Sequence, residues 1–346
     1  MEIWRKSFER AIRDIMWSQW SALGAYVEVE PCRKALVDPE AILVATCALG
    51  RDDARIFDEA MDWTVVNHRL LRPWRMRRIS RSFGPEVTRT LGAVLEYVSM
   101  EVGAEVFPGV RDEARGSLGE VEVEELFRRE KGLFGVAGKD ADTVFARWKL
   151  LRGAPRIRRH SGTPDRSNPA NLMLRLRDFY GSGARADVMT YLLTEGGGSS
   201  NGIATKISYR QGQVYRVLEN LVSAGIAHKR GGRGNAHYWI DREAVAVSLG
   251  LEGELPAFFA WGDVFLAFHL VASDWERNKE KYADDFLAAE RMRDLAARVV
   301  PLLGKAGGPL SRLPFPVPGA LKGMEHARAL MDFLQQAADI LQSYMQ

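Results

Sequence analysis

Residues 208–225 constrain the fold most, because both ends and one buried face of a helix can be read from them. Ser208 and Gln211 have the spacing of a capping box, in which a Ser hydroxyl and a Gln amide satisfy backbone N–H groups at a helix start. We therefore expect a helix that begins at Tyr209. Its apolar residues recur at helical spacing, namely Val214, Val217, Leu218, Leu221 and Val222. Gly225 is expected to end it, since glycine readily adopts the left-handed conformation that closes many helices.

The residues before this helix predict two more. Residues 185–193 have an apolar helical face, and the glycines at 196–198 are expected to end that helix. Ser199 or Ser200 can cap a short second helix that runs to Ile207 and leaves only a tight turn before Ser208. Two helices joined by such a turn are typical of the helix-turn-helix.

Two extended runs follow Gly225, at 226–230 and 235–240, around a glycine tip that carries Arg233. This pattern predicts a β-hairpin, and three helices with a basic hairpin make a winged helix. The run SYRQGQVYRVLENLVSAGIAHKR at 208–230, with its hairpin, resembles the winged helix-turn-helix domains of MarR- and ArsR-like bacterial transcription regulators. The resemblance covers roughly a sixth of the chain and implies a DNA-binding domain.

The length of 346 residues is too great for one such unit and predicts two or three domains. We expect a mainly α protein in four segments. They are a helical N-terminal domain at 1–152, a basic linker or arm at 153–183, a winged helix-turn-helix at 184–247, and a helical C-terminal domain for dimerisation or sensing at 248–346.

Cysteine usage and hydropathy predict a cytoplasmic protein without a membrane segment. The two cysteines, Cys32 and Cys47, are typical of a reducing compartment and are best interpreted as small buried hydrophobes. Residues 1–6 lead into an amphipathic helix, not into an apolar signal segment. The longest apolar stretch, 255–271, contains Pro256, Asp263 and His269, so it predicts a buried helix.

The charge is unevenly distributed. Residues 147–182 hold nine Lys and Arg against two acids, 183–200 have a net charge of −1, and 201–245 hold seven cations against three acids. The stretch 147–245 therefore carries +10, and the rest of the chain must carry −7, because the total is +3. A basic middle region is typical of a nucleic-acid contact.

Helices are expected through most of 1–152. Asp38, Pro39 and Glu40 are a strong start signal for a helix that ends at Gly50. A second helix from Asp52 or Asp53 has one apolar face, made of Ile56, Phe57, Ala60, Met61 and Val65. Further helices are expected at 86–100 and 140–151, and the acidic run 119–125 is either an edge strand or a helix start.

Two arginine-rich stretches each have two interpretations. Residues 69–81 are either a second nucleic-acid contact or a solvated helix whose Leu70, Leu71, Met76 and Ile79 pack inward, and we favour the solvated helix. The linker around Arg156, Arg158 and Arg159 is either a cationic arm that lies along phosphates or enters a minor groove, or a loop that pairs with acidic neighbours. Both interpretations of the linker stay open.

After the hairpin, 242–249 is expected to be a short helix or strand, followed by long helices at 255–281, 283–303 and 321–344. A broad apolar face on the last helix could close the core of its domain or form a dimer seam. It is made of Met324, Ala327, Leu330, Met331, Phe333, Leu334, Ala337 and Leu341.

No constellation of catalytic residues is present in the sequence. Residues 180–187 are superficially similar to the glycine-serine loop of minimal nucleotidyltransferases, but the next acid after Asp187 is Glu195, inside a helical pattern, so a pair of metal-binding carboxylates is missing. The six histidines are scattered, the cysteines lack zinc-site spacing, and 196–200 lacks the Gly-Lys-Ser/Thr of a P-loop. We expect no enzyme activity, no cofactor and no metal.

The helix that starts near Tyr209 is expected to enter a major groove. Arg can read guanine and Gln adenine, so Arg210 and Gln213 are the best base readers, whereas Gln211 is used in capping and Arg216 holds a phosphate. The hairpin cations are expected to contact the DNA backbone, with Arg233 in a narrow minor groove. The full candidate set is Lys206, Tyr209, Arg210, Gln211, Gln213, Arg216, Lys229, Arg230, Arg233, Arg156, Arg158 and Arg159.

These features predict a sequence-specific regulator of transcription that binds double-stranded DNA and acts as a repressor. A single winged helix makes few base contacts, so a homodimer is expected, and the flanking helices suggest a small-molecule or protein effector. One alternative is a winged-helix protein-interaction scaffold. Another, by analogy, is an antitoxin-like autorepressor of a toxin–antitoxin or phage-defence operon.

Overall fold

The computed structural model describes residues 1–116, 118–119, 121–127, 140–181, 183–232, 234–251, 253–315 and 321–346. Its described part is mainly helical, which confirms the expected class. The chain forms two compact units, each built from separated stretches. We call residues 16–29 and 39–164 the small unit, and residues 1–15, 30–38 and 165–346 the large unit. The segment boundaries expected at 152, 183 and 247 stay predictions. Among the described residues, no helix is both long and apolar enough to span a membrane.

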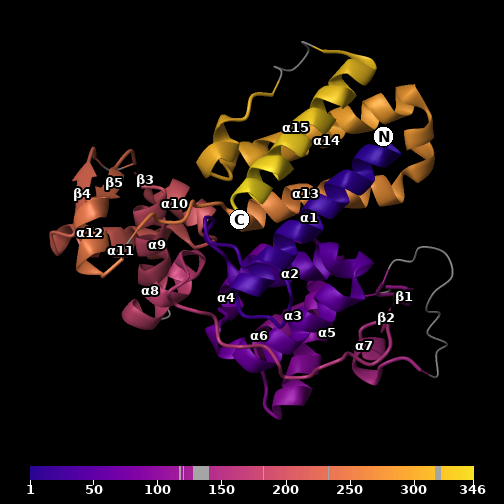
Figure 1. Ribbon diagram of the computed structural model, residues 1–346, viewed down its shortest axis with the longest axis horizontal. Helices are drawn as coiled ribbons and strands as arrows, with labels where there is room; N and C mark the ends of the chain where they lie inside the picture. Colours follow the sequence, from indigo (N-terminus) through magenta and orange to yellow (C-terminus); the bar gives the residue numbers. More distant parts are fainter. Residues whose placement is uncertain are drawn as a thin grey trace. The chain divides into compact units, whose positions relative to one another are not determined.

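The small unit is a group of helices with one short parallel sheet (Figure 1). Its helices are α2 (Pro39–Leu49), α3 (Ala54–Asn67), α4 (Pro73–Phe83), α5 (Pro85–Val102), α6 (Pro108–Gly116) and α7 (Thr143–Arg147). Its strands are β1 (Glu124–Glu125) and β2 (Leu150–Leu151). Short 3-10 helices lie at Gly50–Asp52 and His68–Leu70. The long helix α1 (Glu2–Ala22) supplies residues to both units.

Local signals account for the helices α2 and α3. Pro39 stands at the first position of α2, and Asp53 caps α3 by accepting hydrogen bonds from the backbone N–H groups of Arg55 and Ile56. All five residues of the predicted apolar face of α3 are buried. The expected starts of both helices are therefore confirmed.

The arginine-rich stretch 69–81 contains α4, and Leu71, Met76 and Ile79 are buried, as the favoured interpretation requires. Arg75 is a correction to the solvated face, because its side chain is 1 % exposed and pairs with the equally buried Glu40. A buried arginine needs such a partner, since an uncompensated charge inside a protein is costly.

The helix expected at 140–151 is wrong in extent. Asp142 caps α7, but α7 ends at Arg147, and Lys149 has a left-handed backbone with φ of 60°. Residues 150–151 then form β2, which pairs in parallel with β1, so Glu124 lies opposite Leu150. Of the two interpretations of the acidic run 119–125, the strand is the one observed at Glu124–Glu125. Pairing between distant segments decides both outcomes, and no local pattern reports it.

The large unit carries the remaining elements (Figure 1). They are α8 (Leu172–Tyr180), α9 (Ala184–Thr194), β3 (Gly197–Ser199), α10 (Ser200–Lys206), α11 (Gln211–Ser223), β4 (Ala227–Arg230), β5 (His237–Ile240), α12 (Arg242–Ser248), α13 (Trp261–Arg277), α14 (Asp285–Lys305) and α15 (Gly323–Ser343). Short 3-10 helices lie at Pro169–Asn171, Lys279–Ala283 and Gly308–Arg312. The expected hairpin at 226–240 is present as β4 and β5.

Helices α13, α14 and α15 pack in sequence and share one apolar core. Ala327, Leu330, Leu334, Ala337 and Leu341 of α15 are fully buried, so its apolar face closes the core of this unit instead of forming a surface seam. Helix α13 begins at Trp261, not at Leu255, and the indole N–H of Trp261 donates to the carbonyl of Leu36 at 2.5 Å. Cys32 and Cys47 are both buried and unbridged, as expected, and burial raises the pKa of the Cys32 thiol to about 12.

Candidate nucleic-acid interface

The segment from α9 to β5 builds a helical group on a small antiparallel sheet. The strand order is β3-β5-β4. Gly197 of β3 and His228 of β4 both lie opposite Trp239 of the central strand β5. Strand β3 was missed, because the glycines at 196–198 were interpreted only as a helix end. Helix α9 does end before them, at Thr194, and Gly196 adopts a φ of 101°.

A buried polar network holds the start of α11. Arg177 of α8 forms a two-pronged ion pair with Asp187 of α9, with Nε–Oδ1 at 2.8 Å and Nη2–Oδ2 at 2.9 Å. The hydroxyl of Tyr209 donates to the same carboxylate at 2.9 Å. All three side chains are buried. Tyr209 is therefore a correction: it was expected among the DNA-contacting residues, but its ring is 2 % exposed and ties α11 to the α8–α9 pair.

The predicted capping box is also wrong. Ser208 has a left-handed backbone with φ of 57°, and α11 begins at Gln211, not at Tyr209, with no side-chain cap from Arg210. The Gln211 amide donates instead to the hydroxyl of Ser200, which joins α10 to α11 at 2.9 Å. At the other end the prediction is confirmed, because Gly225 adopts a φ of 71° just after the helix.

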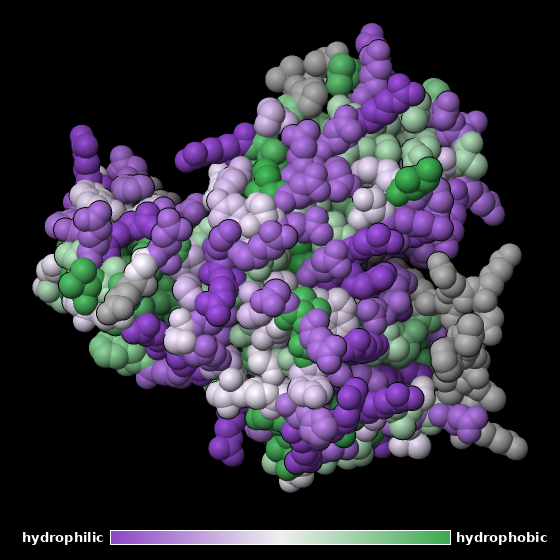
Figure 2. Space-filling model, in the orientation of Figure 1, coloured by the Kyte–Doolittle hydropathy of each residue, from purple (hydrophilic) through white to green (hydrophobic). Residues whose placement is uncertain are grey.

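The outward side of the α11 start is polar and cationic. Arg210, Gln211, Tyr215 and Arg216 are exposed and Gln213 is half-buried, whereas Val214, Leu218 and Leu221 are buried. Arg216 is steadied by a hydrogen bond from its Nε to the carbonyl of Gly212 at 3.3 Å. Within the part of the chain that the structure describes, no carboxylate lies within ion-pair distance of Arg210 or Arg216. The surface over α10 and the β3-β5-β4 sheet is mostly hydrophilic in the view of Figure 2.

Two other candidate cations are ion-paired. Lys206 of α10 contacts Glu195 at 2.9 Å and lies 5.7 Å from the centre of the Tyr191 ring. Lys229 of β4 pairs with Glu219 of α11 at 2.7 Å. Arg230 of β4 is exposed, and Arg233 lies outside the described residues.

The same Glu219 also ties β5 to α11. The Tyr238 hydroxyl donates to Glu219 at 2.6 Å. Burial and this hydrogen bond raise the pKa of Tyr238 to about 12, so the tyrosine stays protonated at neutral pH. Hydrogen bonds from Lys229 and Tyr238 lower the pKa of Glu219. This triad fixes the hairpin on α11.

The linker arginines belong to the small unit and pair with acidic residues there, which is the second of the two interpretations left open above. Arg158 pairs with Glu59 at 3.0 Å and Arg159 with Glu101 at 3.4 Å, while the backbone N–H of Arg156 donates to Asp58. More of the basic stretch is used in the same way. Ion pairs also hold Arg147, Arg152, Arg166 and Arg177. The charge of +10 is therefore not one continuous basic surface.

Asp62 of α3 anchors this linker. Its buried carboxylate accepts hydrogen bonds from the backbone N–H groups of Arg158, Arg159 and Ser161 and from the Ser161 hydroxyl. Burial disfavours the charged form, but these hydrogen bonds outweigh it and lower the pKa of Asp62. Its ionised form thus stabilises the folded linker.

We expect Asp62→Asn to lower the stability of the chain at pH 7 by about 1–3 kcal/mol, because buried donors lose their acceptor. A folded-state pKa below the usual value means that Asp62 contributes fully above a pH of about 4 and progressively less below it. Urea unfolding followed by tryptophan fluorescence should show the gap between wild type and variant narrowing from pH 7 to pH 3. A gap that is constant over this range would contradict the role of the ionised carboxylate.

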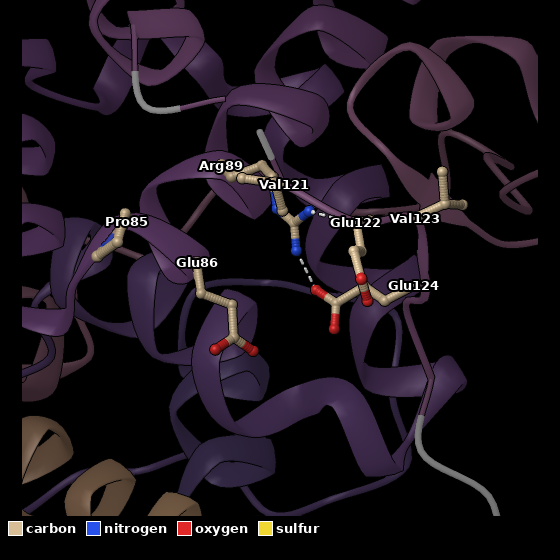
Figure 3. A pocket seen from close by; sticks show the side chains of 7 residues that line it. All are labelled: Pro85, Glu86, Arg89, Val121, Glu122, Val123 and Glu124. Atoms are coloured by element: carbon tan, nitrogen blue, oxygen red, sulfur yellow. Dashed lines mark hydrogen bonds and ion pairs between the residues drawn. The ribbon is translucent and has the colours of Figure 1, made fainter. Parts of the chain in front are cut away.

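A cavity of about 380 Å³ in the small unit is lined by Pro85, Glu86, Arg89 and residues 121–124. Arg89 points toward Glu124, and the two form an ion pair (Figure 3). Burial lowers the pKa of Arg89. Glu86 is paired with Arg51. The charged groups along this cavity thus compensate each other, and its lining has no side chain suited to act as a nucleophile.

A second cavity, of about 640 Å³, lies in the large unit. Its walls are formed by Glu195, Gly308, Pro309, Ser311, Arg312, Leu313, Ile340 and Tyr344. Apolar walls with a few polar groups and a volume in this range are usual for small-molecule sites. Glu195 is also the partner of Lys206, so the cavity borders the residue that ends α10.

Sequence reasoning missed the Arg177–Asp187 pair. Both residues stand at positions that a helical apolar pattern turns inward, and that is the signal from which the pair could have been found. Among the described residues, no group of three or more His, Cys, Asp or Glu side chains is placed to hold a metal ion. Comparisons of the chain with protein-family models, with curated proteins and with solved structures gave no match.

Proposed function

We propose that residues 184–247 are a winged helix-turn-helix domain and that the chain is a sequence-specific regulator of transcription, a repressor that occupies its operator without chemistry. The observation that carries this proposal is the exposed start of α11, where Arg210 and Arg216 project from a helix whose other face is buried. A helix presented in this way can enter a major groove. The element order α9-β3-α10-α11-β4-β5 supports the same assignment.

Each candidate contact then has a role. Arg210 reads a base edge, preferably guanine. Gln213 and the exposed Gln211 lie in the first turn of α11 and add polar base contacts. Arg216 and Arg230 hold phosphates, and Arg233 extends this contact at the hairpin tip. Tyr209 supports the reading helix from inside instead of touching DNA.

A single domain of this kind makes few base contacts, so we propose that the protein binds as a homodimer to two half-sites. The linker arginines are left out of the contact surface, because their loop is fastened to acidic residues of the small unit. The cavity beside Glu195 is the proposed effector site. A ligand there would act on Lys206 through their shared ion pair.

Salt dependence tests the proposal. Genomic duplexes that co-purify with the protein are labelled, and their affinity is measured by fluorescence anisotropy between 50 and 200 mM salt. A dimer with three or four phosphate-contacting arginines per protomer should lose roughly 10³- to 10⁵-fold in affinity, because each neutralised phosphate releases counterions. Binding that is independent of salt, or no duplex binding at any salt, would overturn the DNA-binding role and favour a protein-interaction scaffold.

A further inference from the structure

The β3-β5-β4 sheet has two faces of different character. One face turns Lys229 and Tyr238 toward Glu219 of α11. Since side chains alternate along strands, the other face carries their neighbours. We call this the outer sheet face, made of Gly197, Ser199, His228, Arg230, His237 and Trp239. The register places His228 opposite Trp239 and Arg230 opposite His237.

Aromatic rings form a continuous stack on the outer sheet face. The His228 and Trp239 ring centres are 5.5 Å apart with an angle of 29° between planes, and those of His237 and Trp239 are 6.1 Å apart at 36°. Gly197 makes room for this stack. A Cβ at Gly197 would come within 3.1 Å of both the His237 ring and the Trp239 Cβ.

The stack is accessible and has a cationic border. His228, His237 and Arg230 are exposed, and Trp239 is half-buried. Among the described residues, no carboxylate lies within ion-pair distance of Arg230, and none of the six residues of the outer sheet face is acidic. Flat aromatic rings beside an uncompensated guanidinium match a partner that has exposed π-faces and negative charge.

We propose that the outer sheet face binds single-stranded nucleic acid, with an unpaired base stacked on the His228–Trp239–His237 rings and a phosphate held by Arg230. Single strands fit better than duplexes, because bases inside a duplex already stack on each other and offer no free face. Helix α11 packs on the opposite face of the sheet, so this surface is distinct from the proposed duplex-reading helix. The inference goes beyond the proposed function and does not depend on it.

The test measures fluorescence anisotropy of a labelled 15-nucleotide oligothymidine and, separately, of a labelled duplex, with the full chain. Trp239→Ala should weaken oligothymidine binding roughly ten- to hundredfold, because base–aromatic stacking contributes strongly to such complexes. Trp239→Phe keeps a stacking ring and should stay within about threefold of wild type. Phe179→Ala, which removes an exposed aromatic ring from α8, is the matched control and should leave binding unchanged.

A surface variant protects the test against a folding defect in Trp239→Ala. Arg230→Gln should reduce the slope of log affinity against log salt by about 0.7 for the single strand, as expected for one lost phosphate contact. Equal weakening by Trp239→Ala and Trp239→Phe, or no effect of Trp239→Ala and Arg230→Gln, would overturn the proposal. So would a loss confined to duplex, which would identify the face as a duplex-backbone contact. Failure of the duplex-reading role would show separately, as absent duplex binding with oligothymidine binding retained.

Discussion

Replacing Arg210 with alanine is expected to lower the affinity for operator duplex by roughly ten- to hundredfold per half-site, because one bidentate base contact is worth about 1–3 kcal/mol. Arg210 immediately precedes α11, is exposed, and has no carboxylate within ion-pair distance in the described chain. Its loss should therefore remove a contact to DNA without removing one within the protein. Anisotropy titrations with operator duplex and with a duplex altered at one base pair measure both affinity and specificity.

Two variants separate base reading from general charge. Arg216→Ala should weaken binding to all duplexes alike and reduce the salt slope by about 0.9, as for one phosphate contact. Arg298→Ala removes an exposed arginine from α14 and should leave the affinity unchanged. If Arg210→Ala weakened operator and altered duplex equally, Arg210 would be a phosphate contact and not a base reader.

The second large effect is expected at Asp187. Asp187→Ala should lower the free energy of unfolding by about 3–5 kcal/mol, because it leaves the buried guanidinium of Arg177 without its partner. It also removes the acceptor of the Tyr209 hydroxyl, so the start of α11 loses its anchor. Urea denaturation followed by circular dichroism measures the change in stability.

Tyr209→Phe is the graded control for this network. It removes only the hydroxyl that donates to Asp187 and should cost about 1 kcal/mol, with the Arg177–Asp187 pair left intact. Because Tyr209 is buried, its effect on duplex affinity should be smaller than that of Arg210→Ala. An Asp187→Ala variant as stable as wild type would show that the network does not support the α11 start.

Several corrections share one cause, which is that a short polar residue has both local and distant partners. Ser208 and Gln211 match a capping box, but Gln211 bonds to Ser200, and Ser208 lies in a left-handed turn. Residues 196–198 match a helix end, yet Gly197 is also a strand residue opposite Trp239. The distant partner prevails in each case because the fold brings it within hydrogen-bonding distance, a choice that local spacing cannot reveal.

Local sequence by itself determined the mainly helical class, the starts of α2 and α3, the inward residues of α11 and the β4–β5 hairpin. These depend on periodicity, capping and turn chemistry, which act within a few residues. Tertiary structure alone decided which charges are spent inside the protein. It paired Asp187 with Arg177 and Asp62 with the linker, whereas Arg210 stayed exposed. The physical reason is that a buried charge needs a partner, and the partner is brought close by packing between segments far apart in the chain.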